Sequence, residues 1–182
     1  MINKILVAVD RSKNGKSIFN SALSLAQTTG AELMLLQVVS TSEPGYPILP
    51  TYTYYPVVDD REYDTYQKQL AEYKQWGLDF LQNLTQEATA KGVATEYTQL
   101  TGNPGRLICE LAGNWSAELI VVGSRGLKGL KEMFLGSVSN YVTHHAPCSV
   151  LIVRQPIDTN SNKETSEKAA IDREQLITNP ND

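Results

Sequence analysis

Long apolar runs and metal-ligand motifs are missing from this chain of 182 residues. The apolar run at Ile5–Val9 is broken by Asp10 and is too short for the core of a signal peptide. No other stretch approaches the ~18 apolar residues of a membrane span. We therefore expect neither a secretion signal nor contact with a membrane. The two cysteines, Cys109 and Cys148, lack metal-binding or redox spacing, which predicts inert core thiols in a reducing cytoplasm.

An excess of positive charge is also absent. The net charge is −4 at neutral pH, which argues against a nucleic-acid partner, because duplex binders usually carry a basic face. The tail after Arg154 accounts for most of that charge, so the rest of the chain is close to neutral. Residues 155–182 lack the spacing of a core element and are predicted to be disordered, with a helical patch at 168–176. Residues 1–154 are expected to form one domain, since 41% of the chain is apolar.

Apolar segments alternate with helical patterns along residues 1–154. Strands are expected at 2–9, 32–39, 93–100, 119–122 and 149–153, and helices at 12–30, 63–90, from 103–104 onward, and at 138–145. The third strand alternates apolar and polar residues, which predicts a sheet edge. Short connections between strands and helices favour parallel pairing. The chain is thus predicted to be an α/β protein, with a doubly wound five-stranded parallel sheet in the order 3-2-1-4-5 and helices on both faces.

A long connection at residues 40–60 interrupts this alternation. It is rich in proline and tyrosine, and it exceeds the usual length of a connection between two elements. Two interpretations stay open, a lid over a ligand or a cover for the sheet edge or for a partner surface. Its carboxylates, Glu43, Asp59 and Asp60, are interpreted as solvated loop residues.

The segment from Gly123 to Ser137 begins on a buried strand and ends at the start of a helix. Its glycines at 123, 126 and 136 allow the backbone to approach an anion closely. The free N–H groups at the start of the helix and the positive charge of Arg125 favour a phosphate group. The segment has neither the P-loop pattern nor G-x-G-x-x-G. Phosphate binding is favoured here, and the alternative is that the glycines serve only tight turns.

The spacing Gly123-x2-Gly126-x9-Gly136-Ser137, followed by the run from Val138 to Arg154, resembles the nucleotide-binding signature of the universal stress protein family. The opening Ile-Leu-Val-Ala-Val-Asp-x-Ser, which ends at Ser12, is similar to that family's first strand and acidic residue. The resemblance covers residues 1–154 except most of the 40–60 connection. An intact signature implies a member that binds ATP.

The resemblance also implies a role for each residue of the site. Asp10 is expected at the adenosine end, and the backbone of Val38 beside the base. Gly123 and Gly126 are expected under the ribose and phosphates. The residues expected to bind the phosphates through N–H and hydroxyl groups are Gly136, Ser137, Val138 and Ser139. The residues expected to complete the wall are Ala8 and Val122.

The function that these residues favour is that of a regulatory stress-response protein, which binds ATP or another adenine nucleotide such as AMP. The resemblance implies a homodimer formed through Ser149–Val153. A slow ATPase is one alternative, and it would need Mg²⁺ or Mn²⁺ bound through the phosphates. A nucleotide-independent scaffold for an unknown protein partner is another. No catalytic residue is assigned, and no metal site is expected at His144 and His145.

Overall fold

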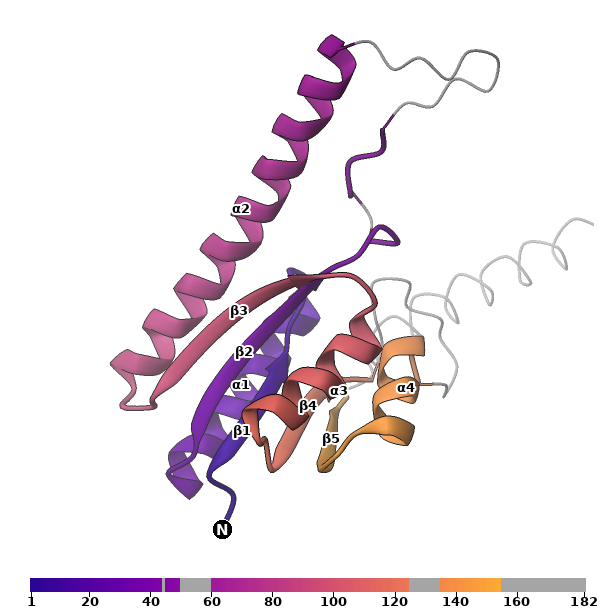
Figure 1. The fold of residues 1–182 in the computed structure, drawn as a ribbon. Coiled ribbons are helices and arrows are strands. Elements are labelled where there is room, and N and C mark those ends of the chain that lie inside the picture. Colours follow the sequence, from indigo (N-terminus) through magenta and orange to yellow (C-terminus); the bar gives the residue numbers. More distant parts are fainter. Residues whose placement is uncertain (44, 50–59, 125–134, 155–182) are drawn as a thin grey trace, which may run out of the picture.

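The sheet has the predicted topology. The computed structural model describes residues 1–43, 45–49, 60–124 and 135–154. Within these residues, five parallel strands form one sheet in the order β3-β2-β1-β4-β5 (Figure 1). The strands are β1 (Lys4–Ala8), β2 (Glu32–Val39), β3 (Thr95–Thr101), β4 (Leu119–Gly123) and β5 (Ser149–Val153). The α/β class and the strand order are therefore confirmed.

The central strand, β1, pairs on both sides. Ile5 lies opposite Leu33 of β2 on one side and opposite Leu119 of β4 on the other. The chain order reverses at this point, because β2 and β4 leave β1 in opposite directions across the sheet. In sheets of this type, ligands bind outside the carboxyl ends of the strands where the order reverses. A ligand site is therefore expected at the carboxyl ends of β1 and β4.

Two of the helices in the described part of the chain cover each face of the sheet. Helices α1 (Lys13–Thr29) and α2 (Asp60–Ala90) lie on one face, and α3 (Pro104–Trp115) and α4 (Ser137–His145) lie on the other. Successive residues of a strand point to opposite faces. Ile5 and Val7 accordingly belong to the core beneath α1 and α2, whereas Leu6 belongs to the core beneath α3 and α4.

The helix ends follow the signals in the sequence. Ser12 caps α1, where its side chain accepts hydrogen bonds from the N–H groups of Asn14 and Gly15. Gly30 ends the same helix in the left-handed conformation, with φ 74°. Asn103 caps α3 by accepting a hydrogen bond from the N–H of Arg106. These caps confirm the predicted boundaries.

Several other boundaries differ from the expected ones. Strand β1 begins at Lys4 rather than residue 2, because Lys4 pairs with Glu32, where β2 itself begins. Strand β3 starts two residues later than expected, since its pairing with β2 begins at Thr95. Helix α2 begins at Asp60 rather than residue 63. Asp60 is therefore a residue of a helix's first turn, where a carboxylate is favoured by the helix dipole, and its interpretation as a loop residue was wrong.

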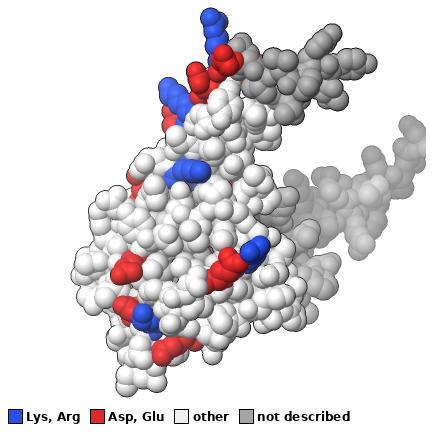
Figure 2. All heavy atoms as spheres, in the orientation of Figure 1, with Lys and Arg blue, Asp and Glu red and all other residues white. Residues whose placement is uncertain are grey.

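Helix α2 is far longer than the sheet needs. It has 31 residues, and its buried residues begin only at Tyr73, after which they recur every three or four positions to Ala88. The first turns project past the carboxyl ends of the strands (Figure 1). Figure 2 shows that Lys, Arg, Asp and Glu gather on this projecting end, while charges of both signs are scattered over the rest of the visible face.

Candidate functional site

The loop after β1 places Asp10 at the carboxyl edge of the sheet. Asp10 is half-buried, and its Oδ1 accepts hydrogen bonds from the backbone N–H of Ser12, at 3.1 Å, and from the Ser12 hydroxyl. The first turn of α1 packs closely beneath this loop. A Cβ atom on Gly15 would lie 1.9 Å from the carbonyl oxygen of Asp10. The position of the Asp10 carboxylate is thus determined by a cap and by a close backbone approach.

The end of β4 lies beside the start of α4. The N–H of Ser124 donates to the carbonyl of Val153 at 2.9 Å, and the N–H of Gly136 donates to the carbonyl of Ser124 at 2.8 Å. The hydroxyl of Ser139 donates to the carbonyl of Gly123. These bonds attach the first turn of α4 directly to the end of the strand. Gly123 and Gly136 are thereby brought to the same edge as Asp10.

The start of α4 carries no side-chain cap. Its N-cap is Gly136, whose backbone is extended, and within the described residues no side-chain cap hydrogen bond is made there. The first N–H groups of a helix have no partner within it. Those of Ser137, Val138 and Ser139 therefore point out of the helix at its positive end, an arrangement that suits an anion.

The apolar residues of the predicted site lie on one face of the sheet. Val38 and Val122 are buried, and Ala8 and Val138 are half-buried against the same core beneath α3 and α4. They come from three neighbouring strands and from α4, so the structure brings them together. Arg125 and Gly126 lie outside the described residues.

Ser139 differs from the other predicted phosphate ligands. Ser137 is exposed at the first helical position, whereas only 4% of Ser139 is exposed. Because the Ser139 hydroxyl already donates its hydrogen to Gly123, its backbone N–H is the donor left for an anion. The hydroxyl has a structural role that the sequence did not reveal.

Sequence reasoning missed a second group of residues at this edge. Glu43 is half-buried, and the Tyr73 hydroxyl of α2 donates to its Oε2 at 2.6 Å. The interpretation of Glu43 as a solvated loop residue was therefore wrong. The Arg11 guanidinium lies 4.4 Å from the centroid of the Tyr73 ring. The burial of Tyr73 agrees with the helical spacing, but no sequence signal pairs it with a residue 30 positions away.

Burial and charge act in opposite directions on Glu43. Burial raises the pKa of its carboxyl above the usual value, and the charge of Asp10 adds to this effect more weakly. The hydrogen bond from Tyr73 and the charge of Arg11 lower that pKa. Burial and the hydrogen bond to Glu43 both raise the pKa of Tyr73.

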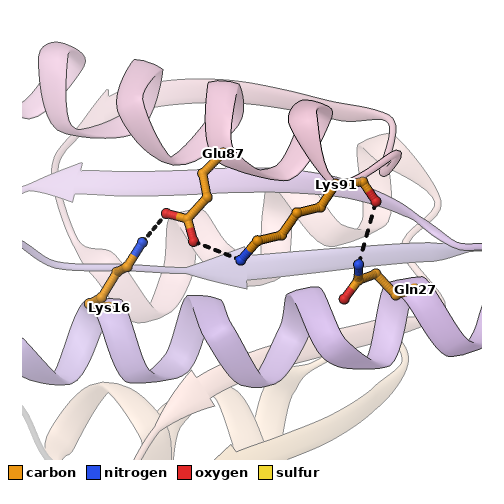
Figure 3. Close-up of polar contacts among 4 residues, drawn as sticks. All are labelled: Lys16, Gln27, Glu87 and Lys91. Atoms are coloured by element: carbon orange, nitrogen blue, oxygen red, sulfur yellow. Dashed lines mark hydrogen bonds and ion pairs between the residues drawn. The ribbon is translucent and has the colours of Figure 1, made fainter.

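An ion-pair group joins α1 to α2 on the same face of the sheet. Glu87 of α2 accepts hydrogen bonds from Lys16 of α1 and from Lys91, and Gln27 donates to the Lys91 carbonyl (Figure 3). The bonds from Lys16 and Lys91 lower the pKa of Glu87. A hollow lined by Gln27, Lys91 and neighbouring residues opens at the amino ends of β2 and β3, away from Asp10.

Two other side-chain types were singled out in the sequence. The His145 ring stacks on Tyr141, with 4.0 Å between centroids, and its Nδ1 lies 2.9 Å from the Tyr141 carbonyl oxygen. Among the described residues, no three His, Cys, Asp or Glu side chains gather as a metal site would require.

Cys109 and Cys148 are half-buried, and burial raises the pKa of both thiols. None of the described helices could span a membrane.

Comparison with known proteins places this geometry in context. The model of the universal stress protein family matches residues 1–154. The chain is 40% identical to universal stress protein Sll1388 of Synechocystis over 153 residues, which cover 83% of this chain and 97% of the relative. It is 39% identical to universal stress protein YxiE of Bacillus subtilis over 156 residues, which cover 85% and 100%.

Solved structures share the fold. A universal stress protein family member from Arabidopsis thaliana, solved with AMP bound, matches with a TM-score of 0.59 and 23% identity, over 86% of this chain and 94% of that one. A universal stress protein solved in complex with cAMP matches with a TM-score of 0.57 and 23% identity, over 84% and 97%. At these identities the likeness shows the common architecture of the three chains.

Proposed function

The chain belongs to the universal stress protein family, and from this premise we propose that it binds an adenine nucleotide and acts as a regulatory protein of the stress response. The observation that carries the proposal is the uncapped start of α4, attached to the end of β4 beside the loop that holds Asp10. One edge of the sheet then offers donors for an anion and, across the strand-order reversal, a carboxylate for hydroxyl or amine groups.

The two ends of the nucleotide bind to different parts of the proposed site. The phosphates bind at the N–H groups of Ser137, Val138 and Ser139, beside Gly136. The ribose or the base lies toward Asp10, whose carboxylate accepts hydrogen bonds from hydroxyl and amine groups. The apolar wall is formed by Ala8, Val38 and Val122. Gly123 and Gly126 complete the phosphate end, as the family signature implies, and Arg125 adds positive charge there.

The ligands of related structures support an adenine nucleotide. The structural neighbours from the same family hold AMP in one case and cAMP in the other. Both ligands combine adenosine with a phosphate group, which matches a site with an anion-binding end and a hydrogen-bonding end. Any Mg²⁺ or Mn²⁺ would enter with the phosphates of ATP, since the site is assigned no protein ligand for a metal.

A homodimer and a cytoplasmic setting belong to the same proposal. Strand β5 lies at an edge of the sheet, and 40% of the surface of Leu151 is exposed there, beside the half-buried Ile152. An open edge strand with exposed apolar residues is suited to pairing with a second copy. Sedimentation velocity tests the dimer by the mass of the particle in solution.

The free thiols of Cys109 and Cys148 support the proposal of a reducing, cytoplasmic compartment.

The binding experiment uses isothermal titration with ATP and AMP, on protein first freed of any nucleotide that co-purifies. Gly136→Val is the test variant, because the extended backbone of Gly136, with φ −60° and ψ 158°, accepts a valine without strain. The added side chain would obstruct phosphates at the helix start, so binding should be lost while the fold is kept. Gly113→Val, on the exposed side of α3, is the matched control.

Two results would contradict the proposal in different ways. Absence of heat with both nucleotides would exclude the binding function and leave the nucleotide-independent scaffold as the better hypothesis. Unchanged affinity in Gly136→Val would show that the phosphates bind away from the start of α4.

A further inference from the structure

A group of aromatic and charged side chains lies next to Asp10, where three separate parts of the chain meet. We call it the Glu43 cluster. Its members are Arg11 of the loop after β1, Glu43 and Tyr46 of the segment after β2, and Tyr73 and Trp76 of α2. Each of the three parts contributes to a contact with another, and Tyr73 takes part in most of these contacts.

Tyr73 is the centre of the Glu43 cluster. Its hydroxyl donates to Glu43 at 2.6 Å. The Arg11 guanidinium lies over its ring, 4.4 Å from the ring centroid. The Tyr46 ring meets the same ring edge-on, with 5.8 Å between centroids. The Arg11 guanidinium also lies 5.8 Å from the Trp76 ring. Cation–π contacts of this kind are stabilising, and more strongly so where water is excluded.

The cluster joins the two backbone segments that border the adenosine end of the site. Arg11 lies between Asp10, the predicted ligand of that end, and Ser12, the cap that holds its carboxylate. Glu43 follows β2 by a short turn, in which its N–H donates to the Ser40 carbonyl at 3.0 Å. The charges of Arg11 and Asp10 both act on the Glu43 carboxyl. A displacement of Glu43 therefore changes the surroundings of Asp10.

We propose that Glu43 is a positioning residue of the nucleotide site: with Arg11 and Tyr73 it holds the segment after β2 against the Asp10 loop, and so couples the adenosine end of the site to helix α2. This inference rests on the proposed function. Helix α2 is a suitable receiver of such coupling, because its burial in the domain begins at Tyr73 and its first turns project from the fold.

Coupling of this kind acts in both directions. If Tyr73 and Glu43 improve the binding of a nucleotide, then the nucleotide must stabilise their contact by the same free energy. Binding at the carboxyl edge of the sheet would then order the part of α2 around Tyr73. A regulatory protein could present that change to a partner through the projecting turns.

The first measurement is the affinity for AMP, by isothermal titration, of two conservative variants. Tyr73→Phe keeps the ring beneath Arg11 and removes only the hydroxyl. Glu43→Gln keeps the shape and removes the charge. We expect each to bind AMP roughly 3- to 10-fold more weakly, the change that corresponds to one net hydrogen bond. Tyr63→Phe, at an exposed tyrosine of the same helix, is the control and should bind as the wild type does.

The second measurement is the AMP affinity of the wild type relative to Glu43→Gln as a function of pH. A merely structural role would not make this ratio depend on pH. The groups that face Glu43 are Tyr73 of α2 and Arg11 and Asp10 of the loop after β1. The wild type's advantage over Glu43→Gln should be full where Glu43 is ionised. It should vanish as the pH falls through the pKa of Glu43, because the attraction to Arg11 is then lost. Protonation of AMP itself cancels in this ratio.

Tyr73→Phe adds a prediction of sign to the profile. The hydrogen bond from Tyr73 lowers the pKa of Glu43. In the Tyr73→Phe background, the pH at which Glu43 loses half of its advantage over Glu43→Gln in AMP affinity should therefore be higher. Hydrogen exchange gives an independent readout: AMP should slow the exchange of amides around residue 73 in the wild type, and should do so less in both variants.

The outcomes separate the two proposals. If the wild type binds neither ATP nor AMP, the proposed function fails, and the coupling fails with it. If the wild type binds AMP and both variants bind it equally well at every pH, only the coupling is overturned. Equal protection of α2 by AMP in the wild type and the variants would also overturn it.

Discussion

Helix α2 lies close against the sheet at Gly77, and this contact gives a sharp test of the packing. A Cβ atom at this position would lie 2.1 Å from Oε1 of Gln37 and 2.3 Å from Nε2 of Gln99. These two side chains hydrogen bond to each other at 3.0 Å, and Gln99 also donates to the Lys74 carbonyl at 2.9 Å. Gly77→Ala would therefore disturb a polar pair that attaches α2 to β2 and β3.

The cost of this substitution follows from three contributions. Alanine in a helix interior is favoured over glycine by about 1 kcal/mol. Against this, overpacking costs about 1–3 kcal/mol, and a buried amide without its partner costs about 1–3 kcal/mol. Gln37 is only 2% exposed, so its side chain cannot turn out to water to avoid the clash. These contributions sum to a net loss of about 1–5 kcal/mol in the free energy of unfolding.

Thermal and urea unfolding measure this difference, and Gly113→Ala is the matched control. Gly113 also lies inside a helix, but its added Cβ would meet only Pro147, at 4.0 Å. The control should be stabilised by about 0.5–1 kcal/mol, which is the helix contribution alone. Gly77→Ala should lower the Tm by roughly 2–20 °C. If both variants gained stability, the close approach of α2 to Gln37 would be refuted.

Two further predictions concern charge and assembly. Glu87→Gln should destabilise the fold by no more than about 1 kcal/mol at pH 7, because the three partners Lys16, Glu87 and Lys91 are each a third or more exposed. The pKa of Glu87 is lowered in the fold, so this contribution is present above the usual carboxyl value of 4.5 and is lost as the pH falls through the lowered pKa. Urea unfolding at pH 7 and pH 3 checks this, and an equal difference at both values would contradict it. Leu151→Glu should convert the proposed dimer into a monomer in sedimentation velocity, since it places a charge on the edge of β5. A dimer that persists in this variant would show that the copies meet elsewhere.

The sequence alone determined the order of the elements and most of their ends. Apolar runs of four to eight residues between helical patterns are enough to indicate buried parallel strands, because a strand covered on both faces has no polar side. Ser12, Gly30 and Asn103 marked their boundaries correctly, since a cap acts on backbone groups only a few residues away. The start of α4 at Gly136 and Ser137 was indicated to within one residue for the same local reason.

What the sequence could not determine depends on distant parts of the chain. The start of β1 and the shift of β3 follow from register with β2, which only the paired sheet defines. The hydroxyl of Ser139 meets the Gly123 carbonyl because the helix start is attached to the strand end. Glu43 is half-buried because Tyr73, from a helix that begins 17 residues later, donates to it. Periodicity describes one element at a time, whereas such contacts exist only once the elements are packed together.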